Sequence, residues 1–426
     1  MRNKLLAAVY KTMSNFGNVV GGEMLLRLAN FGVAALIGRS YGAPALGMYA
    51  TLVAVATLAE KLADNGLELT GIGEVSAHLR YVREIATALY IDKTILSALA
   101  IGLLAIVGRV VGLTPGQWLI AAIVTLRTFL YSYCRLHAGF LKALDKTRQI
   151  AKCQGLHFSL LAFGLIYLFL QHKGLLVLLL YLLAAQIVEY LCSSVVLNRL
   201  GVGLVTIPTS LCWDLIWRSL PVGTTYTLAT AMLRGDVLVL SLVASAGVVG
   251  IFAAADTGLV MIYVIAWLFS GVLLSEFGRH ARNSQALDLH FRKVLRTVML
   301  ISIPLAAAGV LFARSAVIVI FGRSFAAAGF TAAIMLLALP FIFFNAAFLS
   351  RLIAKNAARV AVLIYSPAAI LSLLLNYFLG RYWGAPGVAA SIVLREAVIS
   401  LVFLCLWHLP DRPAELTLTV TSLLNT

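Results

Sequence analysis

Residues 248–275 read VVGIFAAADTGLVMIYVIAWLFSGVLLS, a run of 28 residues in which Asp256 is the only charged side chain. About 20 consecutive apolar residues allow one helix to cross the roughly 30 Å hydrocarbon core of a membrane. Eleven further stretches have the same character, so the sequence predicts twelve membrane spans. The predicted spans are residues 17–38, 46–74, 86–108, 117–141, 154–171, 174–197, 213–244, 248–275, 294–313, 327–350, 359–379 and 386–408.

The composition of the whole chain agrees with this interpretation. Of its 426 residues, 62% are hydrophobic and 12% are charged, and the mean hydropathy is +0.97. Ordinary soluble domains are about 45–50% apolar and about 25% charged, and a soluble fold of this size could not bury so much apolar surface. Soluble enzymes, nucleic-acid-binding proteins and disordered proteins are therefore excluded. Because the apolar runs are continuous and show no period-2 alternation, we expect an all-α polytopic membrane protein.

The net charge of +16 is distributed unevenly along the chain. If the N-terminus is cytoplasmic, 21 of the 33 lysine and arginine residues fall in cytoplasmic segments, six in outer loops and six within spans. Basic residues accumulate on the cytoplasmic side of membrane proteins, so both termini are predicted to be cytoplasmic. The first 20 residues show no small-residue cleavage pattern, so we expect no cleaved signal peptide.

The two halves of the sequence resemble each other. Gly47–Ala50 (GMYA) at the second predicted span matches Gly250–Ala253 (GIFA) at the eighth, with an offset of 203 residues. Weaker matches between later spans have offsets of 210 and 211 residues. Six spans return the chain to its starting side, so the two repeats share one orientation. We therefore expect two parallel six-helix lobes, residues 1–205 and 206–426, with a central cleft.

Charged side chains inside the predicted spans require an explanation, since inserting each one at the membrane centre costs at least about 2.5–3.5 kcal/mol of free energy. Arg127, Tyr131 and Arg135 follow one another at intervals of four on one face of the fourth span. No acidic residue lies within a turn of either arginine on that helix, so an intrahelical pair cannot neutralise them. Planar guanidinium groups suit phosphate or carboxylate, which favours a cationic, water-filled cavity. The predicted substrate-binding residues are Arg27, Arg127, Tyr131, Arg135, Arg234 and Arg395.

Acidic residues within the spans are the candidates for ion coupling or gating. They are Glu23, Asp64, Asp236, Asp256 and Glu396. Alternatives stay open for several of these charges. Glu23 and Arg27 are four residues apart and can pair along one helix face. The arginines of the fourth span can instead pair between helices, with Glu189 or Asp256. Asp236 suits a structural role, a proton site or a cation site.

An acidic stripe lies toward the cytoplasmic end of the second span. Glu60, Asp64 and Glu68 recur at intervals of four residues, and Lys61 can pair with Asp64 or Asn65. A structural or gating contact is therefore favoured over ion coupling at this stripe.

No enzymatic site is indicated. The seven histidines are dispersed, and none combines with cysteines or acids at metal-ligand spacing. The five cysteines, Cys134, Cys153, Cys192, Cys212 and Cys405, show no metal or disulfide pattern and are interpreted as small packing residues. A Walker A loop is missing, so transport powered by ATP within this chain is not expected. We expect a non-enzyme without a cofactor or a metal.

Short motifs of glycine, aromatic and apolar residues occur from one end of the chain to the other. They are Arg27–Asn30 (RLAN), Ile37–Gly42 (IGRSYG), Leu46–Ala50 (LGMYA), Asp64–Leu67 (DNGL), Phe321–Phe325 (FGRSF) and Gly384–Ala389 (GAPGVA). These motifs resemble those of bacterial polysaccharide transporters, the O-antigen and exopolysaccharide flippases. That family is related to the multidrug and toxin extrusion carriers and to the lipid II flippase.

The resemblance implies a flippase that moves undecaprenyl-pyrophosphate-linked oligosaccharide across the bacterial inner membrane for surface polysaccharide biosynthesis, driven by ion antiport. Its implied partners are the lipid-linked oligosaccharide, membrane lipids, and polysaccharide polymerase or chain-length proteins, with the carrier as a monomer. A multidrug or small-molecule ion antiporter of the same superfamily is one alternative, and the arginine-rich spans argue against it. A non-transporting scaffold of a glycan assembly complex is another, and the internal duplication argues against it.

Overall fold

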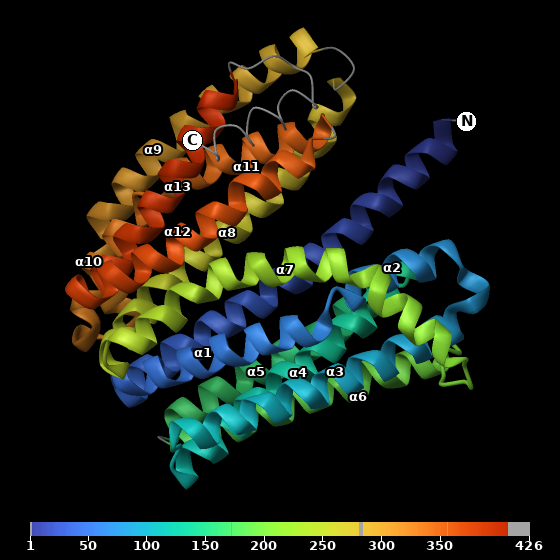
Figure 1. The fold of residues 1–426 in the computed structure, drawn as a ribbon, viewed down its shortest axis with the longest axis horizontal. Coiled ribbons are helices and arrows are strands. Elements are labelled where there is room, and N and C mark those ends of the chain that lie inside the picture. Colours follow the sequence, from blue (N-terminus) through green and yellow to red (C-terminus); the bar gives the residue numbers. More distant parts are fainter. Residues whose placement is uncertain (1, 172, 281–283, 356, 408–426) are drawn as a thin grey trace. The chain divides into compact units, whose positions relative to one another are not determined.

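A computed structural model describes residues 2–171, 173–280, 284–355 and 357–407 of the chain (Figure 1). The side chains of residues 2–20, of Glu23 and of a few other helical positions lie outside the described part. Every regular element within these ranges is a helix, and they contain no strand. The predicted all-α fold is confirmed.

Local sequence determines several helix ends. α3 ends at Val111 and is capped by Gly112, whose φ of +75° is a conformation that favours glycine. α4 begins with a capping box around Pro115, in which the backbone N–H of Thr114 donates to Oε1 of Gln117 at 2.9 Å. The α-helices are α1 (Arg2–Asp64), α2 (Leu67–Ala77), α3 (Val82–Val111), α4 (Pro115–Ala143), α5 (Thr147–Leu170), α6 (Leu175–Arg199), α7 (Thr209–Val243), α8 (Ala246–His280), α9 (Ser284–Phe321), α10 (Ala326–Leu336), α11 (Leu339–Ala354), α12 (Ala358–Trp383) and α13 (Ala385–Trp407).

Ten helices among the described residues are long and apolar enough to cross a membrane, and the bent pair α10–α11 makes eleven if it forms one span. The remaining difference from the twelve predicted spans lies in Met24–Ala77, a stretch of 54 residues that is counted once. Its helical path is interrupted at Gly42, where φ is 80° and ψ is 178°. At about 1.5 Å per residue this stretch is about 80 Å long, enough for two crossings of a core of about 30 Å. The chain is a multi-pass membrane protein.

The outward face of α3 illustrates how the helices meet the lipid. Leu99, Leu103, Ile106 and Val110 are all exposed, and their spacing of three or four residues places them on one face of the helix. In water such a continuous apolar face would drive association, whereas in a membrane it is solvated by acyl chains.

The helices group into two compact units. The first unit contains Met1–Ser40 and Leu52–Arg234, and the second contains Tyr41–Thr51 and Gly235–Thr426. The units differ from the predicted lobes because most of α7 packs with the first unit and a short segment of α1 packs with the second. The lobe boundaries, 1–205 and 206–426, stay a prediction.

Each unit has its own apolar core. In the first unit, Leu89 of α3 and Phe140 of α4 are fully buried and pack with leucines from α2 and α6. The core of the second unit is aromatic, and the rings of Phe348 and Phe403 stack with their centroids 4.6 Å apart. The polar side chains described below are embedded beside these cores.

Two glycines form a close backbone crossing within the second unit. A Cβ added at Gly47 of α1 would lie 1.9 Å from the carbonyl oxygen of Ala246 and 2.7 Å from the backbone nitrogen of Gly250. A Cβ added at Gly250 of α8 would lie 1.8 Å from the carbonyl oxygen of Ala43. Only glycine permits this approach. Gly47 and Gly250 are the residues that the internal sequence match equates, so the two equivalents lie against each other.

Candidate functional site

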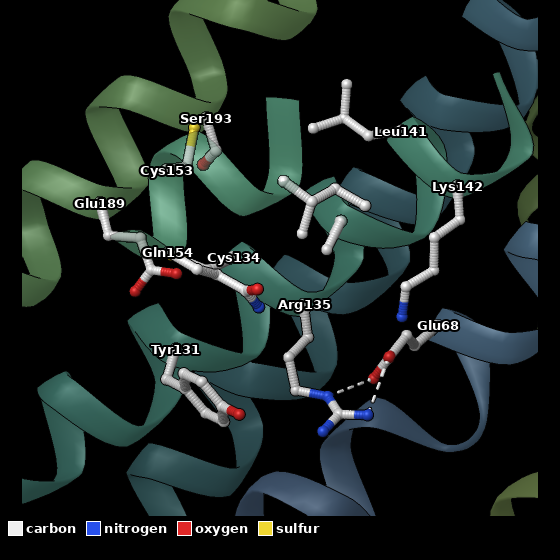
Figure 2. Close-up of a pocket in the computed structure, with 12 residues that line it drawn as sticks. Glu68, Tyr131, Cys134, Arg135, Leu141, Lys142, Cys153, Gln154, Glu189 and Ser193 are labelled. Atoms are coloured by element: carbon white, nitrogen blue, oxygen red, sulfur yellow. Dashed lines mark hydrogen bonds and ion pairs between the residues drawn. The ribbon is translucent and has the colours of Figure 1, made fainter. Parts of the chain in front are cut away.

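A pocket in the first unit is lined by two of the three residues of the predicted stripe on α4. Tyr131 and Arg135 face this pocket, whose volume of about 420 Å³ includes the space at its open side (Figure 2). Its charged and polar lining includes Glu68, Tyr131, Arg135, Lys142, Gln154 and Glu189. The positive charges of the pocket are thus accompanied by carboxylates.

Arg135 is held by a carboxylate from another helix. Its Nε and Nη2 donate to the two carboxylate oxygens of Glu68 on α2, at 2.9 and 3.0 Å. The Glu68 side chain is 7% exposed and that of Arg135 is 35% exposed. Bidentate pairs of this kind are strong and directional. Arg135 therefore makes an interhelical ion pair, with a partner that the sequence reasoning did not consider for it.

Two further arginines of the predicted substrate site, Arg127 and Arg27, also belong to the first unit. Nη2 of Arg127 on α4 donates to Oδ1 of Asn30 on α1 at 3.0 Å. Arg27 is half-buried, and its Nε is buried with no hydrogen-bond partner among the described residues. Arg234 is half-buried at the end of the first unit. Because the side chain of Glu23 lies outside the described residues, its pairing with Arg27 stays a prediction. An anion would satisfy the buried Nε of Arg27.

The acidic stripe on α1 and α2 is engaged in contacts between helices. Glu60 is buried, accepts a hydrogen bond from Oγ of Ser132 on α4 and lies 3.2 Å from Nζ of Lys61. The Lys61 ammonium group thus pairs with Glu60 and not with Asp64, whereas Asn65 contacts Lys61 through the backbone, its N–H donating to the Lys61 carbonyl oxygen at 3.2 Å.

Asp64 pairs with Lys93 of α3, and both side chains are buried, at 6% and 1% exposed. Lys93 is one of the 21 basic residues counted above in the cytoplasmic segments, although it lies within the predicted span 86–108. Its burial shows that it is a structural cation inside the first unit. Two adjacent charged residues, Asp92 and Lys93, inside a predominantly apolar span were the signal for this pair.

The second unit contains a buried network around Arg395. This arginine on α13 is 2% exposed, and its Nη1 lies 3.4 Å from both carboxylate oxygens of Asp236 on α7. Nη1 also donates to Ser372 and Nη2 to Tyr263, both at 3.1 Å. Asn376 donates to Asp236 from α12 at 2.7 Å. The burial of Arg395 favours a structural or coupling role over direct contact with a substrate.

Glu396 is the second carboxylate of the same network. It accepts hydrogen bonds from the Tyr263 hydroxyl at 2.8 Å, from Nδ2 of Asn345 at 2.9 Å and from Nε of Arg395 at 3.3 Å. The network therefore joins two carboxylates to one guanidinium. Asp256, the remaining coupling candidate, is half-buried on α8.

A polar cluster between α5 and α6 was not singled out from the sequence. Nδ1 of His157 lies 3.2 Å from Oε2 of Glu189 and 3.2 Å from the carbonyl oxygen of Ala185. Gln186 donates to Glu189 at 2.7 Å. In the sequence, this cluster is indicated by a titratable side chain inside each of two predicted spans, His157 in 154–171 and Glu189 in 174–197. Among the described residues, no group of three or more histidine, cysteine or acidic side chains is placed to hold a metal ion.

Solved structures of membrane transporters have the same fold. The chain is similar to the lipid II flippase MurJ in an inward closed conformation, at 12% identity over 97% of this chain and 91% of that chain, with a TM-score of 0.73. A multidrug resistance MATE family transporter of the MOP superfamily matches at 14% identity over 94% and 95% of the two chains, with a TM-score of 0.69. A MOP superfamily transporter from Pyrococcus furiosus matches at 14% identity over 97% and 95%, with a TM-score of 0.64. The chain has the fold of these transporters.

A sequence comparison identifies the family to which the chain belongs. Comparison with curated proteins gives no match. A family model described as polysaccharide biosynthesis protein matches residues 13–274. This region includes the whole first unit apart from its first residues, together with α7 and most of α8. Because the match covers more than half of the chain, the chain belongs to the polysaccharide biosynthesis protein family.

Proposed function

We propose that the chain is a flippase that moves an undecaprenyl-pyrophosphate-linked oligosaccharide across the bacterial inner membrane during surface polysaccharide biosynthesis. The observation that carries this proposal is the match of residues 13–274 to the polysaccharide biosynthesis family. The fold shared with a lipid II flippase supports a lipid-linked cargo. Both termini are cytoplasmic in this proposal, and the carrier works as a monomer beside polymerase and chain-length proteins.

The arginines of the first unit are proposed to receive the pyrophosphate. Glu68 neutralises Arg135, and Asp236 neutralises Arg395. These two arginines are therefore weaker candidates for binding the pyrophosphate than the other predicted arginines. Arg27 has a buried Nε without a hydrogen-bond partner among the described residues, and Arg127 donates to a neutral amide. Guanidinium groups bind phosphate oxygens well because their planar donor fork matches the phosphate geometry.

Paired substitutions test this role. In a strain that lacks the chain, we expect the unaltered chain to restore surface polysaccharide and the Arg27→Ala, Arg127→Ala double variant to fail. Lipid-linked oligosaccharide should then accumulate on the cytoplasmic leaflet, while the amount of protein in the membrane stays unchanged. The charge-conserving Arg27→Lys, Arg127→Lys variant is the matched control and should retain part of the activity.

Two results would contradict the proposal. Undiminished surface polysaccharide in the strain that lacks the chain would contradict a flippase function. Altered drug susceptibility with a normal polysaccharide would favour the multidrug antiporter. Full polysaccharide in the alanine double variant would leave the flippase but remove these two arginines from its substrate site.

The buried network of the second unit is proposed to bind the coupling ion. Asp236 and Glu396 share Arg395, so the three charges sum to one negative charge that a proton would neutralise. We expect Asp236→Asn and Glu396→Gln to abolish the dependence of translocation on a proton gradient in vesicles. An unchanged dependence in both variants would remove this network from the coupling mechanism.

A further inference from the structure

Two thiols of the first unit face each other across neighbouring helices. The sulfur atoms of Cys153 on α5 and Cys192 on α6 are 3.2 Å apart, and both residues are free thiols. Cys153 is buried, whereas Cys192 is half-buried. The proposed transport reaction uses neither of them, so their proximity calls for a separate explanation.

The helices that carry the thiols are held in register one turn away. His157 follows the first thiol by four residues on α5, and Glu189 precedes the second by three residues on α6. Residues at these intervals share a helix face. Nδ1 of His157 lies 3.2 Å from Oε2 of Glu189, and both side chains are at most 5% exposed. This buried pair therefore positions the two thiols opposite each other.

Both thiols lie near the same end of the α5–α6 pair. α5 begins at Thr147, six residues before Cys153, and α6 ends at Arg199, seven residues after Cys192. At about 1.5 Å per residue, each thiol is about 9–11 Å from the end of its helix. Basic residues such as Lys152 mark this end as a membrane–water boundary. Of the two thiols, the half-buried Cys192 is the one that a small reagent at this boundary would meet first.

We propose that Cys153 and Cys192 form a dithiol modification site that reacts with small disulfides. Cys192, as its thiolate, attacks one sulfur of the reagent, which forms a mixed disulfide and releases one reagent thiol. Cys153 then attacks the Cys192 sulfur, closing the protein disulfide and releasing the second reagent thiol. The protein loses two protons and two electrons, and the reagent gains both. The sulfur atoms have to approach from 3.2 Å to about 2.05 Å.

The bond would fix one wall of the pocket. Cys153 and Gln154 of α5 and Glu189 and Ser193 of α6 all line it (Figure 2). Cytosolic thiols are kept reduced, so the pair is a dithiol at rest and closes only under oxidising conditions. We expect the disulfide to prevent movement of α5 against α6 and thereby to lower translocation. This expectation rests on the proposed function.

A cleavable full-length chain tests the bond without reference to transport. A protease site is inserted between Lys173 and Gly174, in a chain that also carries Cys212→Ser and Cys405→Ser. Membranes are treated with oxidised glutathione and then cleaved. We expect the two fragments to migrate together without reductant and to separate after reduction, because only a disulfide from Cys192 to Cys153 or Cys134 can join them.

Single substitutions identify the partners. Cys153→Ser should cause complete loss of the joined species, whereas Cys134→Ser on α4 should leave it intact. If no joined species forms, the proposal is overturned. Labelling of Cys192 by a maleimide then distinguishes two causes. A labelled Cys192 shows that the geometry prevents the disulfide, whereas an unlabelled Cys192 shows that reagents do not reach it.

A second measurement connects the bond to transport. Oxidised glutathione should lower oligosaccharide translocation by the unaltered chain and leave the Cys153→Ser, Cys192→Ser double variant unaffected. Cross-linking with unchanged translocation would overturn the effect on transport. A chain that cross-links but never translocates would instead contradict the proposed function and leave the dithiol site standing.

Discussion

Arg395 is among the largest fully buried side chains of the described chain, and its environment shows how a charge is accommodated there. Removing an ion from water costs several kcal/mol, and the cost is offset only by close partners with satisfied hydrogen bonds. Arg395 has two carboxylates, a serine and a tyrosine within 3.1–3.4 Å. Asp64 with Lys93 repeats this arrangement in the first unit.

Removing the arginine alone should destabilise the protein strongly. Arg395→Ala leaves Asp236 and Glu396 buried without a cation, and we expect a loss of about 3–5 kcal/mol of unfolding free energy. The Arg395→Met, Asp236→Leu, Glu396→Gln triple variant removes all three charges together and should lose much less. Thermal unfolding of the purified protein in detergent measures both. Equal losses in the two variants would show that packing volume, and not the orphaned charge, dominates.

Helices approach one another at backbone distance where both sides carry glycine. In the first unit, the break between α1 and α2 at Asn65 and Gly66 lies against α7. A Cβ added at Gly66 would lie 2.6 Å from the backbone nitrogen of Gly223, and one added at Gly223 would lie 2.3 Å from the carbonyl carbon of Asn65. Backbone atoms cannot turn aside as a side chain can, so these elements tolerate no added atom at the contact.

Gly223→Ala should therefore destabilise the first unit, by about 1–3 kcal/mol, as overpacked sites do. Gly73→Ala on α2 is the matched control, because nothing lies within 4 Å of the Cβ added there. The control should be neutral or stabilising by up to about 1 kcal/mol through helix propensity. Unfolding in detergent compares the two, and a neutral Gly223→Ala would refute the close contact.

The crossing of α1 and α8 in the second unit permits the same comparison within one helix. Gly250→Ala places a methyl group 1.8 Å from the Ala43 carbonyl oxygen, whereas Gly258→Ala has nothing within 4 Å. We expect little folded Gly250→Ala variant in the membrane and a normal amount of Gly258→Ala. Fluorescence of a fused reporter in size-exclusion chromatography measures both. Equal recovery would contradict the crossing.

For the whole molecule, the number of crossings made by Met24–Ala77 decides the sidedness of every later loop. Two crossings place the α3–α4 connection outside and the α4–α5 connection inside when the N-terminus is cytoplasmic. Alkaline phosphatase should then be active when fused after Leu113 and inactive when fused after Asp145. A single crossing would reverse both results.

Much of this architecture follows from the sequence because hydropathy is a local property. The spans that contain α3, α4 and α6 were predicted to within four residues, since each apolar run ends where polar residues begin, whereas α5 begins seven residues before its predicted span. The partners of the charges were not predictable in the same way. Glu68 and Arg135 are 67 residues apart, and Cys153 and Cys192 are 39 residues apart, so only packing brings them together. The predicted arginines were found as buried or half-buried residues, but their neutralisation depends on tertiary contacts.

Gly47 and Gly250 also constrain how this part of the chain can change. A side chain added at either position would meet backbone atoms of the other helix, which cannot turn aside. A smaller residue at the opposite position cannot compensate for such a change, because glycine is already the smallest. The crossing therefore holds both positions fixed at once.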